Sequence, residues 1–197
     1  PLAALFQKRY GMQAGNIVGT GIYKPDYVSP DPATGLTPNV TPFWMCSAVG
    51  VEVEVDIETG HVRIPRLINV VDCGKPINPR IVETQISGST LMQLGFSMFE
   101  KMQIDAGQVT NASLADYKIP GIFDVPAVLE SEAVEAYQSN GPFGAKGVGE
   151  TATFCVSPAI ANAIEDACGV RITELPLTPE VVFRALRAKA GKPLGEE

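Results

Sequence analysis

The chain of 197 residues has few of the residues on which nucleophilic and metal sites usually depend. Its only histidine, His61, directly follows the turn sequence ETG, so we expect a solvated surface group rather than a base or ligand. No G-x-S-x-G motif is present. The four cysteines are widely spaced and form no C-x-x-C pair, which excludes the usual zinc and iron–sulfur spacings. Their apolar neighbours in sequence predict buried free thiols in a reducing cytoplasm.

Long apolar runs and an excess of positive charge are also absent. No apolar segment approaches the roughly 20 residues that span a bilayer, so we expect no membrane-spanning helix. The net charge of −7 argues against nucleic acid or an anionic membrane as a partner. The N-terminus starts on proline and lacks a secretory signal pattern, so we expect a cytoplasmic protein and a chain cut from a longer one.

The patterning of the sequence predicts three regions. Residues 1–42 are broken by glycine and proline, which predicts an extended, turn-rich arm with one short strand at 16–23. Residues 43–190 carry the regular patterns of a folded domain. Residues 191–197 are predicted to be a flexible tail.

The first half of the domain has two strong patterns. The sequence VEVEV, the turn ETG and HVRIPRLINVV predict a β-hairpin with one buried and one solvated face. Residues 78–102 predict a helix, with Asn78 as its cap and Pro79 in its first turn. Gly88 and Gly95 each cost that helix roughly 1 kcal/mol against alanine, which indicates close approach of another backbone or a ligand.

The second half of the domain alternates short strands and helices. We predict a small hairpin at 102–110, an edge strand at 128–136, a helix that restarts at 157–158 and ends at Gly169, a short strand at 170–177 and a helix after Thr178. Hairpins in one block and helices in others predict an α+β fold, in which hairpins and a mixed sheet pack with three to four helices.

Residues 141–151, GPFGAKGVGET, form the most distinctive stretch of the sequence, here named the glycine loop. Its glycines allow the backbone to approach a bulky group, and a predicted helix start behind it favours an anion. It is not a Walker A loop, because no Gly-Lys pair precedes Ser or Thr. Glu150 is the candidate base, and the alternative is a tight turn whose acid favours the helix dipole. Gln93, in the apolar part of the helix, is either a site residue or an amide satisfied by backbone.

Five motifs stand in a recognisable order: VEVDIETGHVRIPRLINVVDCGKPINP, VETQISGSTLMQLGFSMFE, ADYKIP, GAKGVGE and VRITELPLTPEVVFRAL. In this order the chain resembles the C-terminal part of the molybdopterin-binding large subunit of the xanthine dehydrogenase/aldehyde oxidase family, the molybdenum hydroxylases. The resemblance covers essentially the whole chain. It implies that the fold is the C-terminal domain that binds the molybdenum cofactor.

The resemblance also implies roles for particular residues. Glu150 is expected to take a proton from water-derived oxygen as that oxygen attacks an electron-poor carbon of a purine, an N-heteroaromatic compound or an aldehyde. Gln93 is expected to hydrogen-bond the pterin, and the backbone of Gly147, Val148 and Gly149 to pass close to it. No side chain of this chain is expected to bind molybdenum directly, because the pterin dithiolene does so.

The resemblance further implies cofactors and partners. The expected cofactor is a molybdopterin-type molybdenum cofactor in a dinucleotide form. Iron–sulfur clusters and FAD are expected on other domains or subunits, and the upstream half of the molybdopterin subunit is expected to supply the other wall of the site. The small-molecule substrate binds there, so the isolated chain is expected to be inactive.

The helix departs from the family pattern at three positions, because Thr84, Ser89 and Leu94 stand where glycine is usual. Larger side chains there are expected to narrow the cleft or to change its contacts. Two alternatives to the enzyme therefore stay open. The chain could be a structural docking domain of a diverged family member without catalysis, or a free-standing module that binds a small molecule or an anion through the glycine loop.

Overall fold

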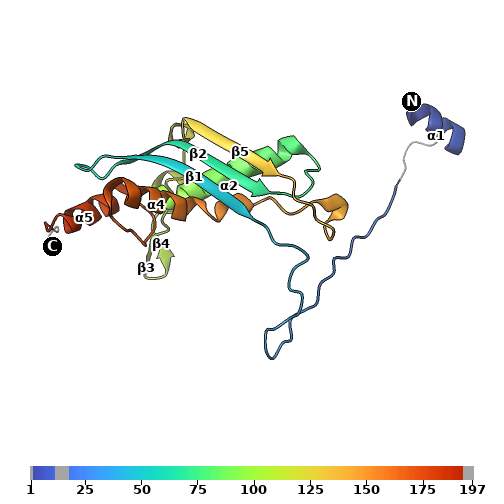
Figure 1. Cartoon of the computed structure of the whole chain (residues 1–197), viewed down its shortest axis with the longest axis horizontal. Coiled ribbons are helices and arrows are strands. Elements are labelled where there is room, and N and C mark those ends of the chain that lie inside the picture. The colour runs from blue at the N-terminus through green and yellow to red at the C-terminus, as the bar shows by residue number, and fades with distance from the viewer. Residues whose placement is uncertain (1, 12–17, 193–197) are drawn as a thin grey trace.

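The computed structural model describes residues 2–11 and 18–192. Its body is a three-stranded sheet in the order β1-β2-β5, with helices against one face (Figure 1). Strands β1 (Ser47–Val55) and β2 (Val62–Asp72) are antiparallel, whereas β2 and β5 (Val128–Val134) are parallel. The sheet is therefore mixed, with β5 at one edge, and the predicted α+β fold is confirmed.

The hairpin of β1 and β2 follows the alternation of its sequence. Along β1 every second residue is exposed, and the valines between them pack against the core. The exposed Glu52 and Glu54 pair across the hairpin with Arg66 and Arg63, which is the arrangement expected of a solvated strand face. His61 is exposed beside the turn, as predicted.

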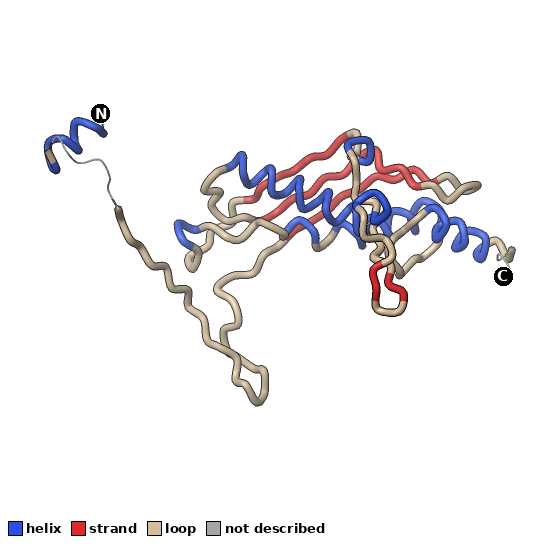
Figure 2. The backbone as a smooth tube through the Cα atoms, turned by 180° about the vertical axis from the view of Figure 1, so that it is seen from behind, coloured by secondary structure: helices blue, strands red, loops and turns tan. Residues whose placement is uncertain are grey.

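Helix α2 (Pro79–Met98) lies against the face of the sheet that the helices cover. Figure 2, which views the molecule from behind, shows this helix in front of the strands. The Asn78 side chain accepts a hydrogen bond from the backbone N–H of Ile81, and Pro79 occupies the first turn, so the predicted start is confirmed. Helix α4 (Val156–Cys168) packs against β1 and ends at Gly169, whose φ of 68° gives the left-handed cap that the sequence predicts. Helix α5 (Pro179–Lys189) begins after its cap, Thr178.

The core lies between these helices and the sheet. Its fully buried apolar side chains come from β2, α2, α4, α5 and the segment between the last two helices: Leu67, Val71, Ile86, Val156, Ile160, Ile164, Leu177 and Val182. Each large aliphatic side chain buried in this way contributes about 1.5–3 kcal/mol, so sheet and helices hold one another in place.

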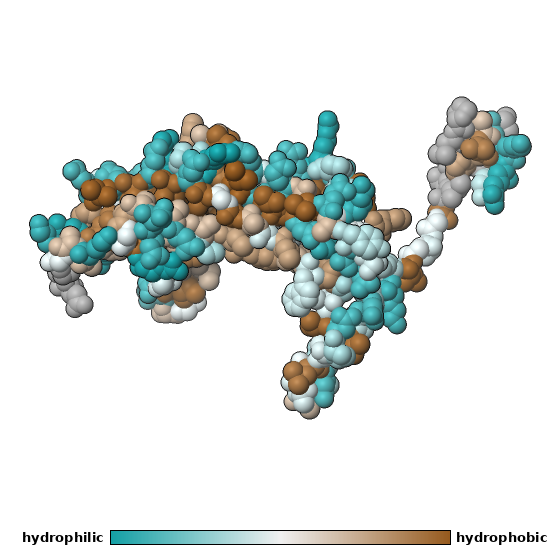
Figure 3. All heavy atoms as spheres, viewed as in Figure 1, coloured by the Kyte–Doolittle hydropathy of each residue, from teal (hydrophilic) through white to brown (hydrophobic). Residues whose placement is uncertain are grey.

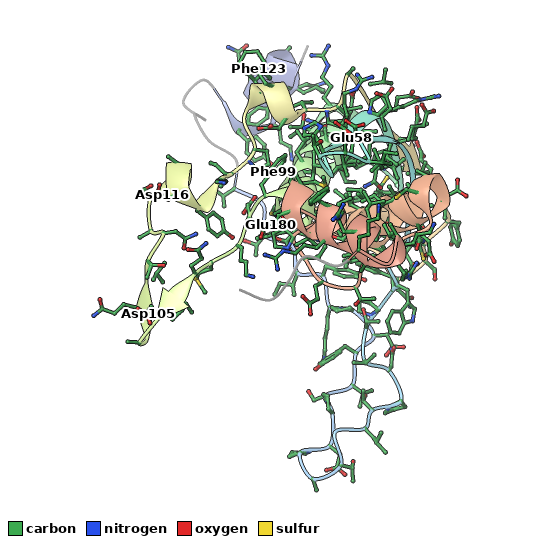
Figure 4. All side chains as sticks on the ribbon, turned by 90° about the vertical axis from the view of Figure 1, so that its left-hand side faces the viewer. Glu58, Phe99, Asp105, Asp116, Phe123 and Glu180 are labelled. Atoms are coloured by element: carbon green, nitrogen blue, oxygen red, sulfur yellow. The ribbon has the colours of Figure 1, made fainter. Side chains whose placement is uncertain are left out.

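The remaining elements are short. Strands β3 (Ile104–Asp105) and β4 (Gln108–Val109) form the predicted small hairpin, followed by helix α3 (Leu114–Tyr117) and the 3-10 helix η1 (Ile122–Asp124). Figure 4 shows Asp105 and Asp116 on this projecting segment and Phe99 closer to the body. In the described part of the chain, no helix is long and apolar enough to cross a membrane.

The N-terminal region differs from its prediction. Helix α1 (Leu2–Tyr10) was not predicted, and residues 18–23 form no strand; residues 16 and 17 of the expected strand lie outside the described residues. From residue 18 the arm runs away from the body (Figure 1), and apolar side chains lie exposed along it, as the brown atoms of Figure 3 show. With no partner strand in reach, its β-forming residues have nothing to pair with.

Two further predictions are wrong. Residues 170–177 form no strand: Val170, Ile172 and Leu177 are buried by packing on the core, and the Leu177 N–H donates to the carbonyl of Ser97 at 2.7 Å. Of the four cysteines predicted to be buried, only Cys73 is: Cys46 is exposed, because it precedes β1 outside the core, and Cys155 and Cys168 are half-buried.

Candidate functional site

A shallow cleft of about 460 Å³ lies between the first half of α2 and the glycine loop. Both chain segments contribute polar groups and glycine to it. Its lining residues are Thr84, Gln85, Gly88, Ser89, Met92, Gly149 and Glu150. A second recess, of about 330 Å³ and largely apolar, lies at the other end of α2 beside Leu94 and Phe99. We place the candidate site in the first cleft, because unpartnered polar groups gather there.

Glu150 is exposed at the edge of the cleft. Its backbone carbonyl accepts hydrogen bonds from the N–H and the hydroxyl of Thr153, so Glu150 caps the 3-10 helix η3 (Thr151–Thr153). Among the described residues its carboxylate has neither a hydrogen-bond nor an ion-pair partner. The predicted helix start is thus a single short turn, and α4 begins only at Val156, so the helix-dipole account of Glu150 is weakened.

The backbone before Glu150 also has free donors. In the described structure the N–H groups of Gly147, Val148 and Gly149 donate no hydrogen bond. The Val148 side chain packs on the small core cluster that contains Val71 and Ile86. The side chain thus anchors the loop, and its backbone is left open to solvent or to a bound group.

The glycine loop is attached to the end of β2. The Lys146 N–H donates to the Cys73 carbonyl at 2.9 Å, and the Lys75 N–H donates to the Gly144 carbonyl at 2.8 Å. Gly74 has a φ of +59°, and a β-carbon there would meet the Gly144 carbonyl, so glycine is required. Asp72 of β2 lies opposite Val134 of the parallel β5, so the segments that follow these two strands leave the sheet at the same edge.

An ion pair reinforces this attachment. The Lys146 ammonium lies 2.5 Å from Asp72 Oδ2, and the two side chains are only 8% and 16% exposed. Burial raises the pKa of Asp72, but the hydrogen bonds from Lys146 and from the Gly74 N–H more than offset this, so the pKa lies below its usual range. Lys146 also donates to the Trp44 carbonyl at 3.3 Å.

Asn69 holds the chain on the other side of Glu150. It is fully buried in β2, and its amide nitrogen donates to the Thr90 hydroxyl at 2.9 Å and to the Ala152 carbonyl at 2.7 Å. One buried amide therefore connects the sheet, α2 and η3, and it fixes the backbone two residues after Glu150.

The two glutamines of α2 lie in different places. The Gln93 amide donates to the Ser157 hydroxyl at 2.6 Å, in the contact between α2 and α4, and Gln93 does not line the cleft. Gln85 is exposed in the cleft, where its Oε1 lies 3.8 Å from the position that a β-carbon on Gly149 would take. The sequence analysis did not single out Gln85 as a site residue. Its place directly after Thr84, near the start of the helix, is the signal that could have indicated it.

The three departures from the family pattern have different effects. Thr84 and Ser89 line the cleft, but their hydroxyls donate back to the carbonyls of Arg80 and Gln85 within the helix. Leu94 is buried in the core and does not line the cleft. The cleft stays open despite the replacements. In the described residues no group of three or more His, Cys, Asp or Glu side chains could hold a metal ion.

Comparison with known families identifies this arrangement. The model of a family described as "Molybdopterin cofactor-binding domain" matches residues 1–126, which include the arm, the hairpin and α2. The match ends before the glycine loop and does not include Glu150, and individual relatives extend the comparison.

Those relatives cover more of the chain. "Probable hypoxanthine oxidase XdhD" of Escherichia coli K12 is 37% identical over 177 residues, which are 89% of this chain and 17% of that protein. "Putative xanthine dehydrogenase molybdenum-binding subunit XdhA" of the same organism is 42% identical over 135 residues, 68% of this chain and 18% of that protein. The solved aldehyde oxidoreductase of Desulfovibrio gigas superposes with a TM-score of 0.66 at 34% identity, over 73% of this chain and 15% of its own. The chain thus spans less than a fifth of the length of these proteins.

Proposed function

The chain belongs to the family of molybdopterin cofactor-binding domains, and from this premise we propose that it forms one wall of the active-site cleft of a molybdenum hydroxylase. In this proposal Glu150 is the proton acceptor. The observation that carries it is the position of Glu150: its carboxylate has no partner in the described structure and borders an open cleft. The domain of residues 43–190 holds this wall, and the arm of 1–42 extends from it.

The groups around the cleft fit a pterin cofactor. A pterin and its phosphates present hydrogen-bonding edges, and the free N–H groups of Gly147, Val148 and Gly149 are suited to them. No heavy atom lies within 4 Å of a β-carbon placed on Gly88, so no side chain of the described structure fills the cleft at this point. The geometry supports Gln85 as the helix amide that contacts the cofactor, and the role of Gln93 stays a prediction.

Each residue then has a definite task. When bound, the cofactor supplies the two-electron oxidation of the substrate carbon with oxygen derived from water. Glu150 receives the proton on a carboxylate oxygen, and the loop backbone orients the bound group. The Lys146–Asp72 ion pair, which is mostly buried, attaches the base of the loop to the end of β2.

The substrate and the partners follow from the same proposal. The names of the relatives refer to hypoxanthine, xanthine and aldehyde, so we propose a substrate with an electron-poor carbon: a purine, an N-heteroaromatic compound or an aldehyde. The rest of the subunit supplies the other wall. Iron–sulfur clusters and FAD on other domains or subunits carry the electrons away, and the cofactor takes a dinucleotide form.

The test is Glu150→Gln in the complete enzyme, which keeps the size of the side chain and removes its basicity. We expect kcat to fall about 10²- to 10⁴-fold, with molybdenum and pterin contents unchanged. Glu83→Gln is the matched control, because Glu83 is exposed on α2 but does not line the cleft. Unchanged turnover of the Glu150 variant at full molybdenum loading contradicts the proposal and favours a domain without catalysis.

A further inference from the structure

We propose that the Lys146–Asp72 ion pair is a positioning device that fixes the Glu150 carboxylate in the cleft. The inference rests on the proposed function, because it explains how Glu150, the proposed proton acceptor, is held at the cleft. Neither residue lines the cleft, so both act through the loop and not on substrate.

The pair joins three segments that are far apart in sequence. Lys146 belongs to the glycine loop, and its ammonium contacts Asp72 Oδ2 at the end of β2. The same ammonium donates to the Trp44 carbonyl, in the segment that leads into β1. Asp72 uses its other oxygen, Oδ1, to accept the Gly74 N–H at 3.0 Å. Both charges are therefore satisfied by groups in fixed positions.

The burial of this pair sets it apart. In every other ion pair of the described residues, both side chains are at least 42% exposed, and such pairs hold little structure together. Lys146 and Asp72 are 8% and 16% exposed. Removing one member leaves the other charge nearly buried without its partner, which forces the loop to move.

The position of Glu150 depends on two attachments to one strand. Lys146 holds the chain four residues before Glu150, and Asn69 holds the Ala152 carbonyl two residues after it. Between these points the loop contains Gly147 and Gly149, and its N–H groups from 147 to 149 make no hydrogen bonds in the described structure. The segment is also held by the Val148 side chain on the small core cluster and by the Thr151 hydroxyl, which donates to the Gly147 carbonyl at 3.2 Å. The two attachments to β2 fix the ends of the segment that carries Glu150.

The experiment compares Lys146→Met with Lys75→Met in the complete enzyme. Lys75 is the matched control, since it adjoins the same loop but forms an exposed ion pair with Glu135, with side chains 61% and 52% exposed. We expect Lys146→Met to lower kcat about 10- to 100-fold, with KM and molybdenum content close to the original, and Lys146→Arg to restore part of the rate. Lys75→Met should leave kcat unchanged.

Hydrogen exchange supplies a readout other than activity. In Lys146→Met the amides of residues 75 and 146, whose hydrogen bonds attach the loop to the end of β2, should exchange faster, with and without cofactor, while those of β1 and β2 exchange as before. An unchanged kcat, or unchanged exchange in the loop, overturns the inference. If Lys146→Met fails to assemble, Asp72→Glu keeps both charges and shifts the contact: altered loop exchange together with a reduced kcat supports the inference, and altered exchange at full kcat overturns it.

The two proposals fail separately. If Glu150→Gln is fully active, the proposed function is wrong, whatever Lys146→Met does to exchange. If Glu150→Gln is inactive while Lys146→Met keeps its rate, the positioning role alone is wrong.

Discussion

The two halves of helix α2 carry the same residue types in opposite surroundings. In the first half, Gln85 and Gly88 are exposed and line the cleft beside Glu150. In the second half, Gln93 is bound to Ser157 of α4, and Gly95 is buried. A glutamine and a glycine therefore face an open cleft at one end of the helix and take part in packing at the other.

The difference arises from what lies against each half. A β-carbon on Gly95 would lie 2.9 Å from Cδ of Pro120 and would collide with the side chain of Glu100, whereas a β-carbon on Gly88 has no heavy atom within 4 Å. Both glycines cost the helix the same in intrinsic propensity. Gly95 allows close packing within this chain, whereas no heavy atom of the described structure lies close enough to Gly88 to require glycine there.

The largest effect is expected for Gly95→Ala. The added methyl group has no space, so the free energy of unfolding should fall by about 1–3 kcal/mol. Urea denaturation followed by circular dichroism measures this. A variant as stable as the original chain would show that Pro120 and Glu100 move aside freely, and the contrast between the two halves would disappear.

A smaller difference in the free energy of unfolding is expected between variants of the two glutamines. Gln93→Ala removes a hydrogen bond at a part-buried helix contact and should lower the free energy of unfolding by about 0.5–1.5 kcal/mol. Gln85→Ala removes no side-chain hydrogen bond of the described structure, so its free energy of unfolding should stay within about 0.5 kcal/mol of the original. In the complete enzyme, however, Gln85→Ala should retain less molybdenum after dialysis. Loss of molybdenum from the Gln93 variant alone would reverse our assignment of the helix amide.

The smallest effect, of opposite sign, is expected for Gly88→Ala. Alanine favours the helix and meets no neighbouring atom, so the free energy of unfolding should rise by up to about 1 kcal/mol. The same denaturation experiment tests it, with Gly95→Ala as its counterpart. A destabilised variant would indicate that the cleft is more tightly packed than the structure shows.

Local patterns in the sequence predicted most of the fold. The alternation in VEVEV, the cap at Asn78 and the left-handed Gly169 each depend on neighbours within a few residues, and all three are confirmed. The features that were missed depend on distant contacts. Residues 170–177 alternate like a strand, but they pack on the core and pair with no neighbouring strand.

The candidate site was predictable to a similar degree. Glu150 belongs to the glycine loop in the sequence, so their proximity could be predicted without knowledge of the fold. The choice between Gln85 and Gln93 required the fold. Helix α4, more than 60 residues further along the chain, covers the face of α2 that carries Gln93 and leaves Gln85 exposed. For the same reason no pattern indicated that Asp72 would meet Lys146.

The parallel pairing of β2 with β5 has a consequence for how such a domain can diversify. With Asp72 opposite Val134, the segments that follow both strands start side by side at one edge of the sheet and build the base of the glycine loop there. Changes in the length or composition of these two connections alter the cleft without disturbing the strands or the core behind them. Insertions and substitutions at this edge can therefore change the surroundings of Glu150 while the sheet behind them stays intact.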